Sequence, residues 1–162
     1  MRFDVTQKIT APIDDVVAAY ASTELYEALG ASERLSAPEV LDRTEEGGLV
    51  VLRIRYRYIF EMSAAVSAVV DPKKLTWVEE TRHDLAARTI AVTLLPDNYA
   101  DRFSASGRAT CRADGDATVR RIQGDVKVKA LLVSGAVEKA IVEGLEEHLA
   151  QEAPQVAAYL AG

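Results

Sequence analysis

Glu79 and His148 belong to the residue types that most often serve as acids or bases. Glu79 alternates with Trp77 and Thr81 in a stretch with strand periodicity. A carboxyl group among apolar side chains has a raised pKa, so Glu79 could exchange a proton with a bound molecule. His148 lies on an apolar helical face, where an imidazole could carry a proton or contact a ligand. In the simpler interpretation, Glu79 lies on an outward strand face and His148 is a hydrogen-bonded boundary residue.

The sequence does not indicate a metal or cofactor site. His83 and His148 are its only histidines, which excludes a histidine-rich centre, and no ligand spacing supports a mixed site with Glu79. His83 shares strand parity with Trp77, and we expect it near the mouth of any cavity. There is no Walker loop and no G-x-G-x-x-G, G-x-S-x-G or H-E-x-x-H motif. We therefore expect neither a metal nor a cofactor.

Two tyrosines are the best candidates for contact with a small molecule. Tyr56 and Tyr58 alternate with three arginines at positions 53, 55 and 57, which places Ile54 and Phe60 on the tyrosine face. Tyrosine offers an apolar body and a polar tip that can orient a ligand. The alternative is that both tyrosines fill the core and bond to the backbone.

Arg120 shares parity with Ile122 and Val126, so it is also predicted to point inward. A buried arginine needs a partner because an unpaired buried charge is very costly. Glu79 or a ligand carboxylate could fill that role. Alternatively, the side chain reaches water from the end of its strand.

The pattern along the chain predicts the elements that position these residues. Period-2 alternation and turn signals predict seven strands, over 2–10, 37–44, 49–60, 75–83, 89–95, 102–112 and 118–129. Helical periodicity predicts short helices over 13–20 and near 23–29, and a further short one within 62–70. A long final helix begins near Ala130, with a kink or restart near Ala153 because of Pro154.

These elements indicate an α+β domain with a curved antiparallel sheet. Its apolar face needs a cover, and the final helix is the only element long enough to provide one. A curved sheet around one helix leaves a concave apolar space of the kind that ligands occupy. Val137 and Ile141 of the helix are then predicted to share one interior with Tyr56 and Tyr58.

Composition limits the classes of partner. The 162 residues fit one domain, 1–162, and the net charge of -6 disfavours nucleic acid. Residues 131–162 carry five glutamates and one lysine, so acidic membranes are unsuited to that face. A lone cysteine, Cys111, and the absence of a signal peptide or a membrane-spanning run predict a cytoplasmic location. We expect no nucleic-acid partner and no stable membrane insertion, and a homodimer is compatible with the sequence.

Two segments carry a resemblance to a known superfamily. The first is Arg2-Phe3-Asp4-Val5 followed by Ala11-Pro12, with Val16 and Tyr20 in the next helix. The second runs through Gly124-Asp125-Val126-Lys127-Val128-Lys129 and Gly135-Ala136-Val137-Glu138-Lys139-Ala140-Ile141. In these segments the chain resembles the START/Bet v 1-like superfamily of helix-grip proteins, and within it an actinobacterial family of domains of unknown function.

The resemblance implies a cavity for lipids, sterols, polyketides or other apolar compounds. Our leading hypothesis is a carrier or sensor of a small hydrophobic molecule, without catalysis. The residues expected to contact it are Ile54, Tyr56, Tyr58, Trp77, Arg120, Val137, Ile141 and His148. One alternative is an enzyme of the polyketide cyclase/dehydratase type that uses Glu79 or His148. Another is an interaction domain without a true cavity, which uses the arginine row or the acidic helix.

Overall fold

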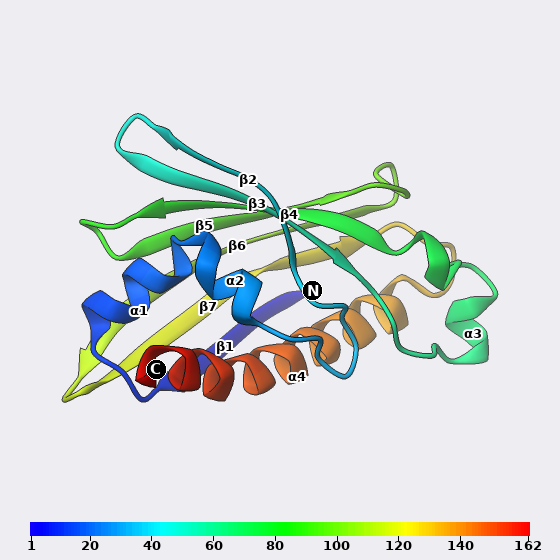
Figure 1. Cartoon of the computed structure of the whole chain (residues 1–162). Helices are drawn as coiled ribbons and strands as arrows, with labels where there is room; N and C mark the ends of the chain where they lie inside the picture. Colours follow the sequence, from blue (N-terminus) through cyan, green and yellow to red (C-terminus); the bar gives the residue numbers. More distant parts are fainter.

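Seven strands form one antiparallel sheet in the computed structural model, which describes residues 1–162 (Figure 1). The strands are β1 (Arg2–Ile9), β2 (Glu39–Glu46), β3 (Leu49–Arg57), β4 (Thr76–Asp84), β5 (Thr89–Pro96), β6 (Phe103–Asp114) and β7 (Ala117–Val128). The helices are α1 (Ile13–Tyr20), α2 (Thr23–Ala28), α3 (Ala64–Ser67), the 3-10 helix η1 (Pro72–Lys74) and α4 (Ser134–Ala161). The sheet order is β1-β7-β6-β5-β4-β3-β2, so the first strand pairs with the last.

The long helix α4 lies across the concave side of the sheet, and α1 and α2 lie on the same side (Figure 1). Helix α4 packs mainly against β1 and β7, and α1 and α2 complete the cover near one end. The main core forms between them, around Ile9, Val16, Leu25, Leu52 and Val156. The predicted α+β helix-grip architecture, with seven strands and a closing helix, is confirmed.

Strands β6 and β7 approach closely at a pair of glycines on the concave side of the sheet. Gly107 of β6 and Gly124 of β7 are direct partners, and the ring of Phe3 lies over them. A Cβ atom on Gly124 would lie 2.2 Å from the Ser106 carbonyl oxygen and 2.7 Å from the Phe3 ring. Only glycine lets the two strands and the ring approach so closely.

The predicted strand to Phe60 is too long. β3 ends at Arg57, and Tyr58 forms only an isolated bridge with Leu35. The chain leaves the sheet there because the Ile59 N–H donates to the Arg34 carbonyl oxygen. Phe60 is exposed and lies under the Arg34 guanidinium, 4.6 Å from the ring centroid, so its predicted inward orientation is wrong.

The helix predictions are right in type, and α1 and α2 lie where they were predicted, whereas the predicted extents of α3 and α4 are wrong. Helix α4 continues through Pro154, so the predicted restart near Ala153 is wrong. Pro154 is exposed, whereas Glu152 and Val156 on either side are buried and hold that turn against the core. The helix predicted within 62–70 is a single turn, α3, whose N-terminus is capped by the Ser63 hydroxyl.

Candidate functional site

Three neighbouring strands bring the predicted site residues to the concave face. Trp77 pairs with Tyr56, and Glu79 pairs with Ile54 on one side and Leu94 on the other. Direct partners in an antiparallel sheet point to the same face. Tyr56 and Ile54 are buried, whereas Trp77, Glu79 and Leu94 are half-buried. Because α4 packs mainly on β1 and β7, this part of the concave face is only partly covered.

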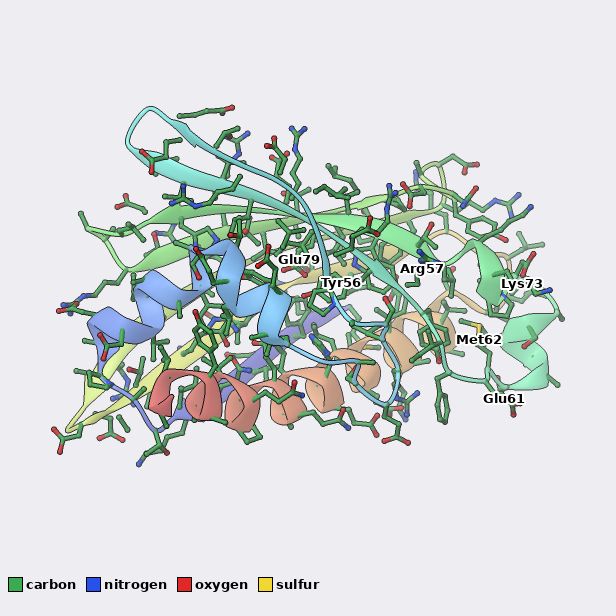
Figure 2. The ribbon with its side chains drawn as sticks, in the orientation of Figure 1. Tyr56, Arg57, Glu61, Met62, Lys73 and Glu79 are labelled. Atoms are coloured by element: carbon green, nitrogen blue, oxygen red, sulfur yellow. The ribbon has the colours of Figure 1, made fainter.

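Glu79 is an acidic side chain in this apolar row, and Figure 2 shows it near the middle of the molecule, above Tyr56. None of the hydrogen bonds or ion pairs in the structure involves its carboxyl group. Burial, together with repulsion from Glu152, raises the pKa of Glu79 from 4.5 to about 6, against the opposing effect of His148 and Arg120. Glu79 therefore changes its protonation near pH 6, and its carboxyl group has no hydrogen-bond partner in the protein.

Trp77 lies beside Glu79 and also has an unused polar atom. Its indole Nε1 is buried and donates to no acceptor. The ring stacks on Tyr56 with a centroid separation of 6.1 Å, and the His148 ring lies edge-on to Tyr56 with its centroid 6.0 Å away. An aromatic cluster of Trp77, Tyr56 and His148 therefore lies next to the carboxyl group of Glu79.

A second buried carboxylate, Glu152 of α4, is fully engaged by the protein. Its Oε1 accepts from the Tyr20 hydroxyl at 2.6 Å and from Gln7 Nε2 at 3.4 Å, and it lies 3.5 Å from Arg120. Burial alone would raise the pKa of Glu152, but the contacts with His148, Arg120 and Tyr20 outweigh it and lower the pKa to about 2. Glu152 is therefore ionised whenever the protein is folded near neutral pH.

Arg120 points inward, as predicted, and its partners come from the protein. One guanidinium nitrogen donates to Gln7 Oε1 at 2.6 Å and the group lies over the Tyr20 ring, with Cζ 4.1 Å from the centroid. Of the two partners considered for Arg120, Glu79 forms no ion pair with it, and Glu152 takes the place of either Glu79 or a ligand carboxylate. Arg120 Nε remains buried without a partner.

The two histidines have different surroundings. His148 lies 3.6 Å from Glu152 Oε2, and its Nδ1 lies 3.3 Å from the Ser32 hydroxyl. Burial lowers the pKa of His148, but Glu152 and Glu79 outweigh that effect and raise it. His83 is fully buried beside Thr81 Oγ1, at 2.8 Å, so its predicted place near a cavity mouth is wrong. Burial, Arg120 and Arg43 lower the pKa of His83 to about 4, so it is neutral at physiological pH.

The remaining predicted contact residues are Tyr58, Ile141 and Val137. Tyr58 is half-buried at the end of the β3 strand path. Ile141 packs on a separate small cluster of Ala105, Val126 and Val142, while Tyr56 belongs to the main core. Val137 is buried near the start of α4.

The arginine row lies on the convex face, where two of its members form ion pairs. Arg53 lies 3.0 Å from Glu80 and Arg55 lies 3.1 Å from Asp97. Arg57 is exposed and forms no ion pair.

Glu152, Gln7, Tyr20, Arg120 and His148 form a buried network, which we call the polar centre. The sequence patterns did not lead us to Glu152, Gln7 or Tyr20 as members of it. The signals were present, since Glu152 is one helical turn after His148 on the apolar stripe of α4. Gln7 has the strand parity of Val5 and Ile9, which marks it as inward-facing. A polar residue at an apolar position was the sign of a buried network.

Two hollows of the surface lie away from this polar centre. One lies over the start of β1 and the part of β7 that pairs with it, around Asp4 and Gln123, and the other lies beside α2, around Ser22 and Arg43. No group of three metal-binding side chains comes together, and no helix is long and apolar enough to cross a membrane.

The arrangement provides two carboxyl groups with opposite properties in one interior. Glu152 keeps its charge and neutralises Arg120, whereas Glu79 holds a proton below about pH 6 and is free to bond to another molecule. Environments that separate the pKa values of two acids are a common basis for acid–base chemistry. The same free carboxyl can also orient a bound ligand.

Residues 4–160 match the family described as protein of unknown function (DUF2505). The chain belongs to this family. No curated protein matches its sequence.

Solved structures share the fold of this DUF2505 chain at low sequence identity. It is similar to the protein TTHA0849 from Thermus thermophilus, with 16% identity, a TM-score of 0.69, and coverage of 99% of this chain and 97% of that one. It is also similar to the Zhui aromatase/cyclase from a Streptomyces species, with 19% identity, a TM-score of 0.66, and coverage of 99% of this chain and 93% of that one. A START superfamily protein from Mycobacterium smegmatis is similar as well, with 16% identity, a TM-score of 0.59, and coverage of 99% of this chain and 97% of that one. These similarities establish a START-like helix-grip fold.

Proposed function

We propose that this protein binds a small, largely apolar molecule that carries a polar group, between α4 and the concave faces of β3, β4 and β5. The observation that carries the proposal is the pair of unused polar groups on β4. Glu79 offers a carboxyl group without a protein partner, and Trp77 offers a buried indole N–H without an acceptor.

Unused polar groups in an apolar setting are costly, and a ligand can remove that cost. A buried donor without an acceptor costs on the order of 1–3 kcal/mol. A ligand oxygen would accept from Trp77 Nε1, and a ligand hydroxyl or amine would donate to Glu79. Tyr56, Ile54 and Leu94 would contact its apolar body. A lipid, sterol or polyketide-like compound has this combination of groups.

The similarity to an aromatase/cyclase supports the proposal at the level of the fold. A small molecule suits the concave side of such a fold because apolar side chains line it and α4 covers part of it. Arg120 has a structural role in this proposal, since Gln7 and Glu152 already engage it.

Binding of a neutral apolar dye, Nile red, tests the site. We expect the wild type to bind it with increased fluorescence, and compounds that co-purify with the protein to displace it. Trp77→Phe keeps the aromatic packing and removes the N–H, so it should weaken an oxygen-bearing competitor about tenfold while dye binding changes little. Glu80→Gln is the matched control for Glu79→Gln because Glu80 is adjacent and faces the convex side, bonded to Arg53. Absence of dye binding, or equal effects of the Glu79 and Glu80 variants on the competitor, would contradict the proposal.

The separated pKa values of Glu79 and Glu152 favour a second candidate, an enzyme of the polyketide cyclase/dehydratase type. Glu79 would donate or accept a proton at the substrate, with His148 as the other candidate. In that case Glu79→Gln or His148→Ala removes turnover of a β-ketone substrate analogue and leaves binding largely intact. Unchanged turnover in both variants would exclude this candidate.

We also propose a cytoplasmic location, because Cys111 is the only cysteine. Fractionation of the native cells tests this location. We propose in addition that the family is distributed among actinobacteria. A homodimer is part of neither candidate function.

A further inference from the structure

One end of the molecule concentrates exposed apolar side chains. It comprises residues 57–75, 96–103 and 127–133, which we call the loop end. Of the large apolar residues that the fold leaves exposed, half belong to it: Ile59, Phe60, Val69, Leu131 and Leu132. Leu131 and Leu132 are 90% and 99% exposed, the highest values among them. Soluble proteins seldom gather exposed apolar side chains in this way without a binding function.

The three segments of the loop end are joined to one another. The Asp71 N–H donates to the Tyr99 hydroxyl at 3.1 Å, Asn98 Nδ2 donates to the Lys74 carbonyl oxygen at 3.2 Å, and the Lys129 N–H donates to the Arg102 carbonyl oxygen at 2.7 Å. Figure 1 shows α3 and the start of α4 at the same end, and Figure 2 shows Arg57, Met62 and Lys73 there.

The two leucines lie in a turn with a defined geometry. The Ser134 hydroxyl donates to the Ala130 carbonyl oxygen at 2.6 Å and accepts from the Ala130 N–H at 2.9 Å, which closes the turn around Leu131 and Leu132. Leu132 has a φ of 68°, a left-handed conformation that is unfavourable for leucine. Strained residues of this kind gather at functional positions.

The charge of the loop end is opposite to that of the rest of the protein. It holds six basic and four acidic residues, a net charge of +2, so the rest of the chain carries -8 within the total of -6. Lysine ion pairs occur at Lys8–Asp114 and Lys139–Glu143, which leaves Lys73, Lys74, Lys127 and Lys129 unpaired and exposed. Asp97 and Asp101 are neutralised by arginines. Glu138, where the acidic surface of α4 begins, is already bonded to the Val128 N–H and the Met1 ammonium.

We propose that the loop end docks on an anionic lipid surface, with Leu131 and Leu132 inserted among the acyl chains and the four lysines against the headgroups. Protruding apolar tips beside unpaired lysines are the combination that gives reversible binding to such a surface. A second copy of the chain fits less well, because a two-fold contact through this end would place the same lysines against each other. The docking is peripheral, and it is independent of the proposed ligand site.

Vesicle co-sedimentation at low salt tests the proposal. The full chain is mixed with vesicles of phosphatidylcholine alone, or of phosphatidylcholine with an equal amount of phosphatidylglycerol. We expect binding to the mixed vesicles, weaker binding to the neutral ones, and release by added salt. Leu131→Ser with Leu132→Ser should reduce the partition coefficient about tenfold or more. Leu41→Ser with Leu85→Ser is the matched control, since both are exposed leucines outside the loop end.

A second pair of variants tests the charges separately. Lys127→Glu with Lys129→Glu should abolish the preference for anionic vesicles, whereas Lys8→Glu, at the far end of β1, should leave it unchanged. Circular dichroism confirms that each variant is folded. The proposal is overturned if the wild type binds neither vesicle, or if the leucine or lysine variants bind like their controls. It is equally overturned if the leucine variants convert a wild-type dimer to a monomer, since the patch would then be a protein interface.

Discussion

At the scale of single residues, Glu79 makes stability depend on pH in an uncommon direction. Its pKa is about 6 in the folded protein against 4.5 ordinarily, so the folded state holds the proton more tightly. Its contribution to stability is therefore lost as the pH rises from 4.5 to 6, by roughly 1–2 kcal/mol. Glu79→Gln should raise the free energy of unfolding by this amount at pH 8 and change it little at pH 4. Urea denaturation at both pH values measures this, and a variant that is less stable at pH 8 would contradict it.

Glu152 has the opposite effect, because its pKa is lowered to about 2. Its contribution is present above pH 4.5 and is lost as the pH falls toward 2. Glu152→Gln leaves Arg120 without its carboxylate, so we expect a loss of about 2–4 kcal/mol at pH 7. Glu146→Gln, exposed on the same helix and without an ion pair, should change stability by less than about 0.5 kcal/mol. Chemical denaturation of both variants compares them, and equal losses would refute the assigned role.

Strand parity predicted the inward direction of Tyr56 and Arg120, and it predicted that Trp77 and Glu79 share one face without deciding which, because a strand has only two faces. It did not predict their partners, which come from elements far away in the sequence. Arg120 is engaged by Gln7 and Glu152 from β1 and α4, and no local pattern encodes that meeting. Polar side chains on apolar stripes were the one available sign.

At the scale of elements, the Gly107–Gly124 pair sets how closely β6 and β7 approach under the Phe3 ring. Gly124→Ala places a methyl group against the Ser106 carbonyl oxygen and the ring, so we expect a loss of about 2–4 kcal/mol. Gly135→Ala is the control, because nothing lies within 4 Å of its Cβ position and alanine favours a helix. Thermal unfolding of the two variants measures the difference. A Gly124→Ala variant as stable as the control would show that the strands can separate at no cost.

The element types were predictable because most segments satisfy their own periodicity. The errors occurred where a distant contact decides the boundary. β3 ends at Arg57 because the carbonyl oxygen of Arg34 accepts a hydrogen bond from the Ile59 N–H. Helix α4 continues through Pro154 because buried residues on both sides of it hold the turn against the core. Hydrophobic periodicity cannot predict either boundary, because the contacts that decide both of them form only in the folded structure.

At the scale of the whole molecule, stability should differ sharply between the sheet and the loop end. The twelve-residue strands β6 and β7 pair along their whole length, whereas α3 is a single turn in which only Val66 is buried. Hydrogen exchange should therefore be slowest in β6, β7 and β1, and fastest in 58–75 and 129–133. Mass spectrometry of peptides after timed exchange measures this. Protection of 58–75 equal to that of β7 would contradict the expectation, and anionic vesicles should slow exchange there if the docking proposal holds.

The pairing of β1 with β7 has a consequence for biosynthesis. Gln7 and Arg120 bond across 113 positions of the sequence, and α4 follows β7. A growing chain therefore emerges from the ribosome with its first strand lacking its native neighbour until nearly all of the sheet has been translated. During that interval the apolar concave face has no lid, which is the condition under which nascent chains recruit chaperones. Slow closure of the long-range pair, rather than formation of any local hairpin, is then the step at which a newly made molecule is most exposed to aggregation.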